Sequence, residues 1–399
     1  KTYMIYLRKL LNMHKALTVM KLSGNNGVIF MTVCKKCLYT SETPGIKFNK
    51  DGICNYCELH DELNRQFPID RNKLLKVAKN IRNGEEYDCV VGMSGGCDSS
   101  YMLYIVKEVM KLNPLAVHFD NGWNTKIAKS NMIKMTKGLN VDLVTYKVDP
   151  AEYNDIYKSF MKAGLPDIEA CTDIALQATL YKYADIYNIK YIMVGHSFRT
   201  EGISPLGWSY MDGGYIKNIQ DTFGKYKLLT YPNLTFWNFI KYMMKGIKRI
   251  RPLYYVDYKK EEVKKFLSDK YDWVWYDGHH KESVITDFVK NYWTFKRYGV
   301  DKRMTELSGT VRSGHISKSE AEKIIKEPPS VTNAVIGEVK DKLDLSDSDI
   351  HKYLVLAGKK TYRDFKTYKK RFEKLRAFFW IMMKLNRVPK SFYTKYCKR

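Results

Sequence analysis

The stretch Gly92-Met93-Ser94-Gly95-Gly96-Cys97-Asp98-Ser99-Ser100 lies between an apolar run and a run with helical periodicity. Its central glycines let the backbone approach a phosphate group closely, because no Cβ atom stands in the way. The start of the following helix adds positive potential, and Asp98 at that start is a candidate helix cap or Mg²⁺ ligand. The amides and hydroxyls available to an anion are those of Ser94, Gly95, Gly96, Ser99 and Ser100. The stretch predicts a phosphate-binding turn, with Ser94 and Asp98 in catalytic roles.

An alternation of strands and helices surrounds this turn. Short apolar runs predict four strands, at 87–93, 115–119, 141–148 and 191–195. Helical patterns predict helices at 98–111, 125–138, 151–163 and 173–187. Strands that alternate with helices form a parallel, doubly wound sheet with right-handed crossovers, and ligands bind beyond the carboxyl ends of its strands. The predicted fold class is therefore α/β.

The chain divides by composition into four parts. Residues 1–30 mix Lys, Met and Leu with weak periodicity, and we expect an extension outside a folded protein that begins near Met31. The alternative is an N-terminal helix from Tyr3 to Leu22. The other parts are a cysteine module at 31–66, the α/β domain at 67–260 and a helical C-terminal region at 261–399. Within the α/β domain, further helices are predicted at 67–83 and, with a basic surface, at 236–249.

Four cysteines near the start of the chain form two C-x2-C pairs, Cys34, Cys37, Cys54 and Cys57. Four thiolates in this spacing satisfy tetrahedral Zn²⁺ and leave no open position for a substrate, so we predict a structural zinc ribbon. A redox pair or free cysteines are the alternatives. His60 lies close to the second pair, but the ligand set is complete without it, and it is predicted to lie on the surface.

Polar residues follow the predicted strands, in the segments 166–173 and 195–202. Arg199 is a candidate for a bidentate contact with phosphate or carboxylate, and Glu201 or Asp173 for a general base or metal ligand. For each of the three, capping or ion pairing within the fold stays equally open. Cys171 is predicted to be a small buried residue and not a nucleophile. Further candidate nucleotide contacts in the second segment are Gly195 and His196, while Asp120 and Arg251 become candidates only through the family resemblance given below.

The chain is strongly basic, with 68 Lys and Arg against 43 Asp and Glu, a net charge of +25. This balance favours anionic partners such as nucleotides, although a solvated lysine surface explains it as well. No run reaches the roughly 18 apolar residues of a membrane-spanning helix, and we expect no secretory signal because the first residues show no apolar run followed by a small-residue cleavage site. Eight cysteines are too few for a disulfide scaffold, so we expect a reducing, cytoplasmic location.

The turn resembles the PP-loop of the N-type ATP pyrophosphatases, which cleave ATP between its α and β phosphates. It lacks the Gly-Lys-Ser/Thr ending of the kinase-type P-loop. The resemblance implies the HUP fold, also called adenine nucleotide α-hydrolase-like, with ATP and Mg²⁺ at the turn. It also implies adenosine contacts in 118–122, which include Asp120, and a core that ends at Arg251-Pro252-Leu253.

A C-x2-C…C-N-Y-C ribbon joined to this loop is similar to the N-acetyl sugar amidotransferases of bacterial O-antigen and flagellin glycan assembly. The resemblance runs from about Met31 to about residue 330, through matching segments at 119–124, 171–173, 195–203, 301–303 and 311–315. It implies that the acetamido oxygen of an acidic, nucleotide-activated sugar is adenylylated, with release of pyrophosphate. Ammonia from a separate glutaminase subunit then displaces AMP and leaves an acetamidino group. No specific nucleic acid partner is implied.

Two other classes of protein stay open. A tRNA-thiolating PP-loop enzyme suits the positive charge, but thiolation usually needs two cysteines near the site, and after Cys97 only Cys171 is available. A non-catalytic zinc-ribbon adaptor would explain the ribbon alone. The intact loop from Ser94 to Ser100 argues against that reading.

Overall fold

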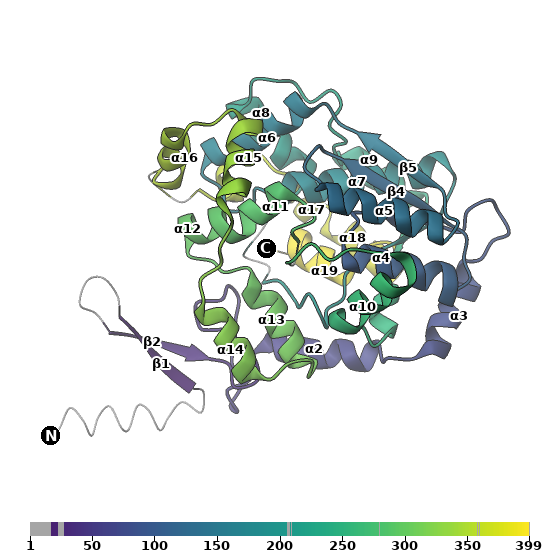
Figure 1. The fold of residues 1–399 in the computed structure, drawn as a ribbon, viewed down its shortest axis with the longest axis horizontal. Coiled ribbons are helices and arrows are strands. Elements are labelled where there is room, and N and C mark those ends of the chain that lie inside the picture. The colour runs from purple at the N-terminus through teal and green to yellow at the C-terminus, as the bar shows by residue number, and fades with distance from the viewer. Residues whose placement is uncertain are drawn as a thin grey trace.

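A five-stranded parallel sheet forms the centre of the molecule (Figure 1). The computed structural model describes residues 17–22, 28–205, 208, 210–278, 280–356, 358 and 360–398. The strand order is β5-β4-β3-β6-β7, and every neighbouring pair is parallel. The strands are β3 (Cys89–Gly92), β4 (Pro114–Asp120), β5 (Leu143–Lys147), β6 (Tyr191–Met193) and β7 (Lys248–Ile250). The predicted α/β class, with a parallel doubly wound sheet, is confirmed.

Helices cover both faces of the sheet and build most of the C-terminal half (Figure 1). The helices and helical turns are α2 (Asn55–Gln66), α3 (Arg71–Ile81), α4 (Cys97–Tyr104), η1 (Ile105–Val109), α5 (Lys126–Gly138), α6 (Pro150–Ala163), α7 (Ala170–Ile186), α8 (Gly213–Phe223), α9 (Phe236–Met244), η2 (Pro252–Tyr255), α10 (Lys260–Tyr271), α11 (Val284–Phe288), η3 (Val289–Trp293), α12 (Thr294–Tyr298), α13 (Arg303–Arg312), α14 (Lys318–Lys326), α15 (Asn333–Leu343), α16 (Asp347–Leu354), η4 (Tyr362–Asp364), α17 (Lys369–Lys374), α18 (Arg376–Lys384), α19 (Lys390–Phe392) and η5 (Tyr393–Cys397). Within the described residues, no helix is both long enough and apolar enough to cross a membrane.

The central strand β3 is buried on both faces, which is why its sequence reads as a continuous apolar run and not as an alternation. Val91 belongs to the apolar cluster that includes Met102 of α4 and Leu267 of α10. Val90, which points the other way, belongs to the cluster that includes Leu180 of α7. The helices thus sandwich the sheet and leave the carboxyl ends of the strands as the free edge for a site.

The basic segment after residue 235 differs from the prediction. The expected helix at 236–249 stops at Met244, and the chain then forms the edge strand β7. β7 pairs with β6, and its first residue, Lys248, donates its backbone N–H to the carbonyl oxygen of Lys190. Pairing with a distant strand overrides the local helical pattern here, because β propensity depends strongly on context.

The N-terminal segment forms a hairpin that leads into the cysteine module. β1 (Leu17–Leu22) pairs antiparallel with β2 (Val28–Val33), which ends immediately before Cys34. In Figure 1 the hairpin extends away from the helices and the sheet. The alternative helix from Tyr3 to Leu22 is wrong for Leu17–Leu22, and its earlier part lies outside the described residues. The extension predicted at 1–30 therefore contains a strand of this hairpin.

The C-terminal region returns to the sheet and to the cysteine module. Trp273, Tyr276 and Glu282 lie against the predicted phosphate turn, and α13 packs beside the cysteine module. The last helices pack on α9 through an aromatic cluster that includes Phe236, Phe372 and Phe392. Residues from both halves of the chain thus surround the carboxyl edge of the sheet.

Candidate active site and metal centre

The predicted phosphate turn lies between β3 and α4 and is held open by its own hydrogen bonds. The Ser94 and Ser99 hydroxyl oxygens lie 3.2 Å apart, and the Gly96 amide donates to Ser94 Oγ at 3.2 Å. Ser99 Oγ also donates to the Gly96 carbonyl oxygen at 3.1 Å. Gly95 has a φ of +81°, and a Cβ atom there would lie 2.0 Å from the carbonyl oxygen of Ala128. Only glycine fits at this position, because the backbone conformation and the close neighbour both exclude a side chain.

A segment from beyond residue 270 fixes the outer side of the turn. Trp273 Nε1 donates to the Gly95 carbonyl oxygen at 3.2 Å. The Asn131 side chain exchanges hydrogen bonds with the backbone of Val274. A Cβ atom on Gly96 would lie 3.1 Å from the Tyr276 hydroxyl and 3.4 Å from the Glu282 carboxyl carbon. Tyr276 and Glu282 thus bring a phenol and a carboxylate to the phosphate turn.

Asp98 sits at the start of α4 in a network of charged and polar groups. Tyr258 donates its hydroxyl proton to Asp98 Oδ1 at 2.5 Å, and Lys260 Nζ lies 3.6 Å from Oδ2. The same lysine lies 3.6 Å from Glu306 of α13. Burial would lower the pKa of Lys260, but the charges of Asp98, Glu306 and Glu201 outweigh it and raise the pKa. Lys260 therefore stays charged and joins Asp98 to the C-terminal region.

The loop after β6 brings His196 and Glu201 to the same edge. Burial, together with the charge of Arg251, lowers the pKa of His196 to about 4, so this imidazole is neutral at physiological pH. Burial, with a smaller contribution from Asp98, raises the pKa of Glu201 to about 8. A Cβ atom on Gly195 would lie 3.5 Å from the Asp98 carbonyl oxygen, so this loop packs against the start of α4. The structure thus brings the predicted residues Gly195, His196 and Glu201 close to Asp98.

Arg199 has a different environment from the one predicted. Its guanidinium donates to Asn64 Oδ1 and to the carbonyl oxygens of Phe67 and Tyr254, at 2.7–2.9 Å. The side chain is buried, so its hydrogen-bonding capacity is used inside the fold. The prediction of a phosphate contact is not supported by this geometry, and we assign Arg199 to holding the ribbon helix α2 against η2.

Asp173 opens α7 on the other side of the edge, beside two lysines from the C-terminal region. Burial raises its pKa, and the positive charge of Lys290 is the largest opposing influence. Glu169 lies nearby, and burial followed by the charge of Asp173 raises its pKa to about 7. Burial and the charge of Lys290 lower the pKa of Lys302 to about 8. Among the described residues, neither lysine has a carboxylate oxygen within 4.0 Å, so both are available to an anion.

Two other predicted contacts differ in exposure. Asp120, at the end of β4, accepts from the Gly122 amide at 3.1 Å and lies 3.4 Å from Lys129 Nζ, and it remains partly exposed. Ser100 is completely buried inside α4 and offers no surface to a phosphate. We therefore keep Ser94 and Ser99, but not Ser100, as hydroxyls of the turn.

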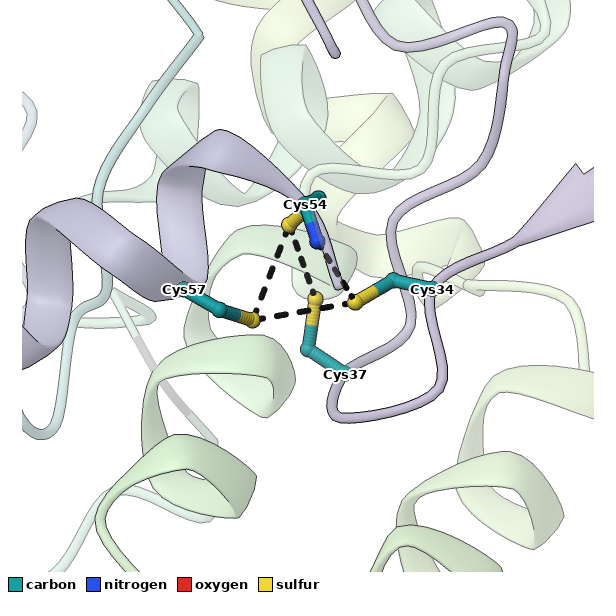
Figure 2. Close-up of side chains that lie close together, drawn as sticks. All are labelled: Cys34, Cys37, Cys54 and Cys57. Carbon is teal, nitrogen blue, oxygen red and sulfur yellow. Dashed lines mark hydrogen bonds between the residues drawn. The ribbon is translucent and has the colours of Figure 1, made fainter. Parts of the chain in front are cut away.

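The four cysteines of the predicted ribbon converge on one point (Figure 2). The Sγ–Sγ distances are 3.7 Å for Cys34–Cys57, 3.7 Å for Cys37–Cys54 and 3.6 Å for Cys54–Cys57. A tetrahedral ion with bonds of 2.3 Å to sulfur requires sulfurs about 3.8 Å apart. All four residues are fully buried. The donor set thus fits a single structural Zn²⁺ with no open position.

Arg312 of α13 completes the surroundings of this metal centre. Its Nη2 donates to Cys37 Sγ at 3.1 Å, and its Nε donates to Cys57 Sγ at 3.3 Å. Four thiolates around Zn²⁺ carry a net charge of −2, so a buried guanidinium reduces the cost of burying the cluster. His60 is also part of this contact: it is buried and its Nε2 lies 3.1 Å from Ser313 Oγ. The prediction that His60 lies on the surface is wrong, because α13 covers it.

The remaining cysteines are enclosed. Cys171 is fully buried and donates to the Ile168 carbonyl oxygen at 3.2 Å, which confirms the prediction of a small buried residue. Cys97 is 3% exposed, and burial raises the pKa of its thiol to about 12. Cys89 and Cys397 are buried as well. Among the described residues, no cysteine outside the metal centre presents a reactive thiolate at the surface.

The strand order, the parallel pairing and the Ser-Gly-Gly-x-Asp-Ser-Ser turn at the end of β3 define an α/β protein of the PP-loop class. Within that class, residues 282–377 match the family described as LPS biosynthesis protein WbpG-like, C-terminal domain. This match supports the resemblance seen in the sequence for the part of the chain that it covers. The chain is also 28% identical over 299 residues to an uncharacterised protein of Methanocaldococcus jannaschii, MJ1599, covering 74% of this chain and 93% of that protein.

Solved structures give weaker likenesses. NMN synthetase from Francisella tularensis is 16% identical with a TM-score of 0.32, covering 73% of this chain and 95% of that one. The U34-tRNA thiolase NcsA from Methanococcus maripaludis, solved with its [4Fe-4S] cluster, is 15% identical with a TM-score of 0.33, covering 79% of this chain and 99% of that one. The class therefore rests on the topology and the turn described above.

Sequence reasoning missed several charged residues that surround the site. These are Lys260 at the end of the α/β domain and, from the C-terminal region, Glu282, Lys290, Lys302 and Glu306. They lie in helices or loops without a distinctive spacing, so no local pattern marks them. The 301–303 segment, which includes Lys302, did stand out as part of the resemblance, and it was the one available signal.

Proposed function

We propose that this chain is an ATP-dependent amidotransferase that converts the acetamido group of a nucleotide-activated N-acetyl sugar into an acetamidino group. The pathway we assign is bacterial surface polysaccharide or flagellin glycan synthesis. The observation that carries the proposal is that the WbpG-like part of the chain, 282–377, supplies charged groups to the PP-loop edge. Glu282 lies against the turn itself, and Glu306 lies 3.6 Å from the lysine that pairs with Asp98.

The reaction requires activation of a poor leaving group. The acetamido oxygen attacks the α-phosphorus of ATP, the bond to the β-phosphate bridging oxygen breaks, and pyrophosphate leaves. Ammonia then adds to the imidate carbon, AMP departs with the former amide oxygen, and loss of a proton gives the neutral amidine. The turn amides, Ser94 and Ser99 would stabilise the charge on the leaving pyrophosphate. Mg²⁺, which Asp98 would hold, supplies further charge neutralisation when bound.

The surrounding charges suit the substrate. Lys290 and Lys302 have no ion-pair partner among the described residues and would contact the carboxylate or phosphate of the sugar nucleotide. Glu201 has a pKa of about 8, which lies close to the working range of a general base. We assign Glu201 to accepting the proton that ammonia loses after it adds to the imidate. Asp173, beside Lys290, would position that lysine.

Ammonia would come from a separate glutaminase subunit. A cysteine-type glutaminase needs a reactive thiol nucleophile, and the cysteines outside the metal centre are buried throughout the described residues. The same burial weighs against the tRNA thiolase alternative, which needs exposed thiols. It does not affect an amidotransferase that receives ammonia from a partner.

The test is an assay of the purified chain with ATP, Mg²⁺, ammonium chloride and a panel of acidic N-acetyl sugar nucleotides. We expect AMP, pyrophosphate and amidine to form in equal amounts, with the amidine identified by mass spectrometry. ATP cleavage that depends on tRNA and a sulfur donor, with no amidine from any sugar, would replace this proposal with the thiolase.

A further inference from the structure

A cavity of about 310 Å³ lies where α7, β7 and the last helices of the chain meet. Gln177 and Tyr181 of α7 line one side, and Arg249 and Arg251 line the sheet edge. Phe392 and Lys395, from the final thirty or so residues, line the opposite side. This last part of the chain lies beyond the WbpG-like match, which ends at residue 377.

The cavity is lined by three basic side chains, Arg249, Arg251 and Lys395, whereas Asp173 acts on Arg249 and Lys395 from outside the lining. Arg249 donates to Gln177 Oε1 at 3.0 Å, which is an uncharged partner. In the described part of the chain, no carboxylate oxygen lies within 4.0 Å of Arg251 or of Lys395. Asp212 also lines the cavity, but its oxygens accept from the Tyr210 hydroxyl and from backbone amides. Partly buried cations without a direct ion-pair partner favour an anion as the ligand.

The walls of the cavity are aromatic. The rings that line it are those of Tyr181, Phe236, Phe239, Tyr368, Phe372, Phe392 and Tyr396. Flat rings of this kind stack on planar ligands, and neighbouring cations strengthen such contacts. Gln177, Thr235 and Ser391 add hydrogen-bonding groups to the lining. A planar ring attached to a polyanion, as in a nucleoside diphosphate, satisfies the walls and the cations together.

The position of the cavity separates it from the place expected for ATP. The PP-loop follows β3, the adenosine contacts are expected after β4, and the cavity lies at β7, on the opposite side of β3 in the sheet. His196 connects the two regions, because Arg251 and Asp98 both influence its pKa. Arg251, which the sequence assigned to ATP, therefore faces a different cavity.

We propose that this cavity binds the nucleoside diphosphate part of the sugar substrate, with Arg249, Arg251 and Lys395 on the diphosphate. The link to catalysis rests on the proposed function, but binding in the cavity does not. The arrangement places the diphosphate at the β7 end of the edge. The sugar then extends past His196 toward the α-phosphate of ATP at the PP-loop.

The experiment measures the affinity of the full chain for UDP, GDP and dTDP by isothermal titration calorimetry. Each titration is done with and without a saturating non-hydrolysable ATP analogue. We expect at least one diphosphate to bind equally well in both conditions. Lys395→Met should weaken that binding by roughly tenfold or more, as loss of a charge-assisted contact does. Lys398→Met is the matched control, because Lys398 is exposed and lies three residues further on. Arg249→Gln tests the opposite wall.

Three outcomes would overturn the proposal. No diphosphate binds, or the ATP analogue competes with it, or Lys395→Met and Arg249→Gln both bind it as tightly as the unaltered chain does. Thermal melting of each variant shows whether the fold is kept. A diphosphate that binds with this pattern while no amidine forms would retain the cavity and reject the reaction. Amidine formation with a KM for sugar nucleotide that Lys395→Met leaves unchanged would retain the reaction and reject the cavity.

Discussion

At the scale of single residues, Asp98 depends on two neighbours that lie about 160 positions further along the chain. Tyr258 donates a hydrogen bond to it, and Lys260 provides a buried positive charge. These contacts hold the carboxylate in one orientation at the start of α4. A carboxylate held in this way needs little reorganisation to bind a metal ion and phosphate.

We predict that Asp98→Asn lowers the rate of pyrophosphate release roughly 10²- to 10³-fold, because a charge-stabilising group is lost. Lys260→Met should also lower it, since the orientation of Asp98 is lost. Lys259→Met is the control: Lys259 is an exposed neighbour that pairs with Asp257 and Glu262. Pyrophosphate release is measured with the sugar nucleotide present. A normal rate in Asp98→Asn would contradict the assignment of the turn.

The shifted pKa values of two residues predict how kcat/KM depends on pH. The pKa of Glu201 is raised to about 8, so this carboxyl becomes a base only as pH rises through that value. The pKa of Lys302 is lowered to about 8, so this lysine loses its charge over the same range. We expect kcat/KM to rise toward pH 8 and fall above it. Glu201→Gln should remove the rising limb, and Lys302→Arg should move the falling limb to higher pH. Unchanged limbs in both variants would exclude these roles.

The sequence predicted the residues whose chemistry depends on local spacing. The turn from Ser94 to Ser99 and the four cysteines need only a short pattern, and the structure brings each set together. It misassigned Arg199 and His60, because the groups that occupy them are distant: Tyr254 for the arginine and Ser313 for the histidine. A single polar residue carries no sign of such a partner.

At the scale of secondary structure, the boundaries around the site follow from packing as much as from propensity. The helices α4 to α7 and the strands β3 to β6 were predicted to within a few residues, because their patterns are local. The edge strand β7 has only three residues and was hidden in a basic helical pattern. Strands this short are defined by their partner, here β6, and not by their own sequence.

The phosphate turn between β3 and α4 requires glycine at position 95, and this requirement can be tested by substitution. We predict that Gly95→Ala destabilises the protein more than Gly84→Ala and abolishes nucleotide binding. Both glycines have positive φ, +81° and +77°, but a Cβ at Gly84 would meet nothing within 4 Å. Gly84→Ala should therefore show only the conformational cost, on the order of 1 kcal/mol. Denaturant unfolding measures both, and equal losses would mean that the turn has room for a side chain.

At the scale of the whole molecule, α13 connects the metal centre to the active edge. Arg312 at its end contacts the thiolates, and Glu306, in its first turn, lies near Lys260. Next to Glu306, a Cβ atom on Gly202 would lie 2.0 Å from the Thr305 carbonyl oxygen, so the loop that carries Glu201 packs directly on this helix. The ribbon also reaches that loop, because Tyr39 donates to the Ile203 carbonyl oxygen at 2.7 Å.

We predict that Arg312→Met accelerates the loss of zinc to a chelator and increases hydrogen exchange in 196–203, because α13 and the ribbon no longer hold that loop. Arg303→Met is the control on the same helix, since Arg303 pairs with Asp301 and not with the thiolates. Zinc release is followed with a colorimetric chelator, and exchange by mass spectrometry. Faster zinc release with unchanged exchange would show that the ribbon is independent of the loop.

The proposed partnership gives a second prediction for the whole protein. The purified chain should form amidine with ammonium, and with glutamine only when a glutaminase subunit is added. The physical reason is that the imidate reacts with water unless ammonia arrives in a protected site. The measurement compares the two nitrogen sources with the same sugar nucleotide. Full turnover with glutamine and this chain alone would show that a glutaminase site has been overlooked.

The contact between Arg312 and the thiolates also bears on how the protein is made. Cys57 and Arg312 are separated by 255 positions, so at synthesis rates of about 5–20 residues per second the ribosome reaches the arginine roughly 13–50 s after the cysteine. During that interval the nascent ribbon carries its four ligands without the guanidinium that offsets their charge, and the loop after β6 has no α13 to rest on. A nascent chain stalled before residue 312 would therefore take up metal early and hold it loosely. Only chains that have been synthesised beyond α13 would then retain the metal ion tightly.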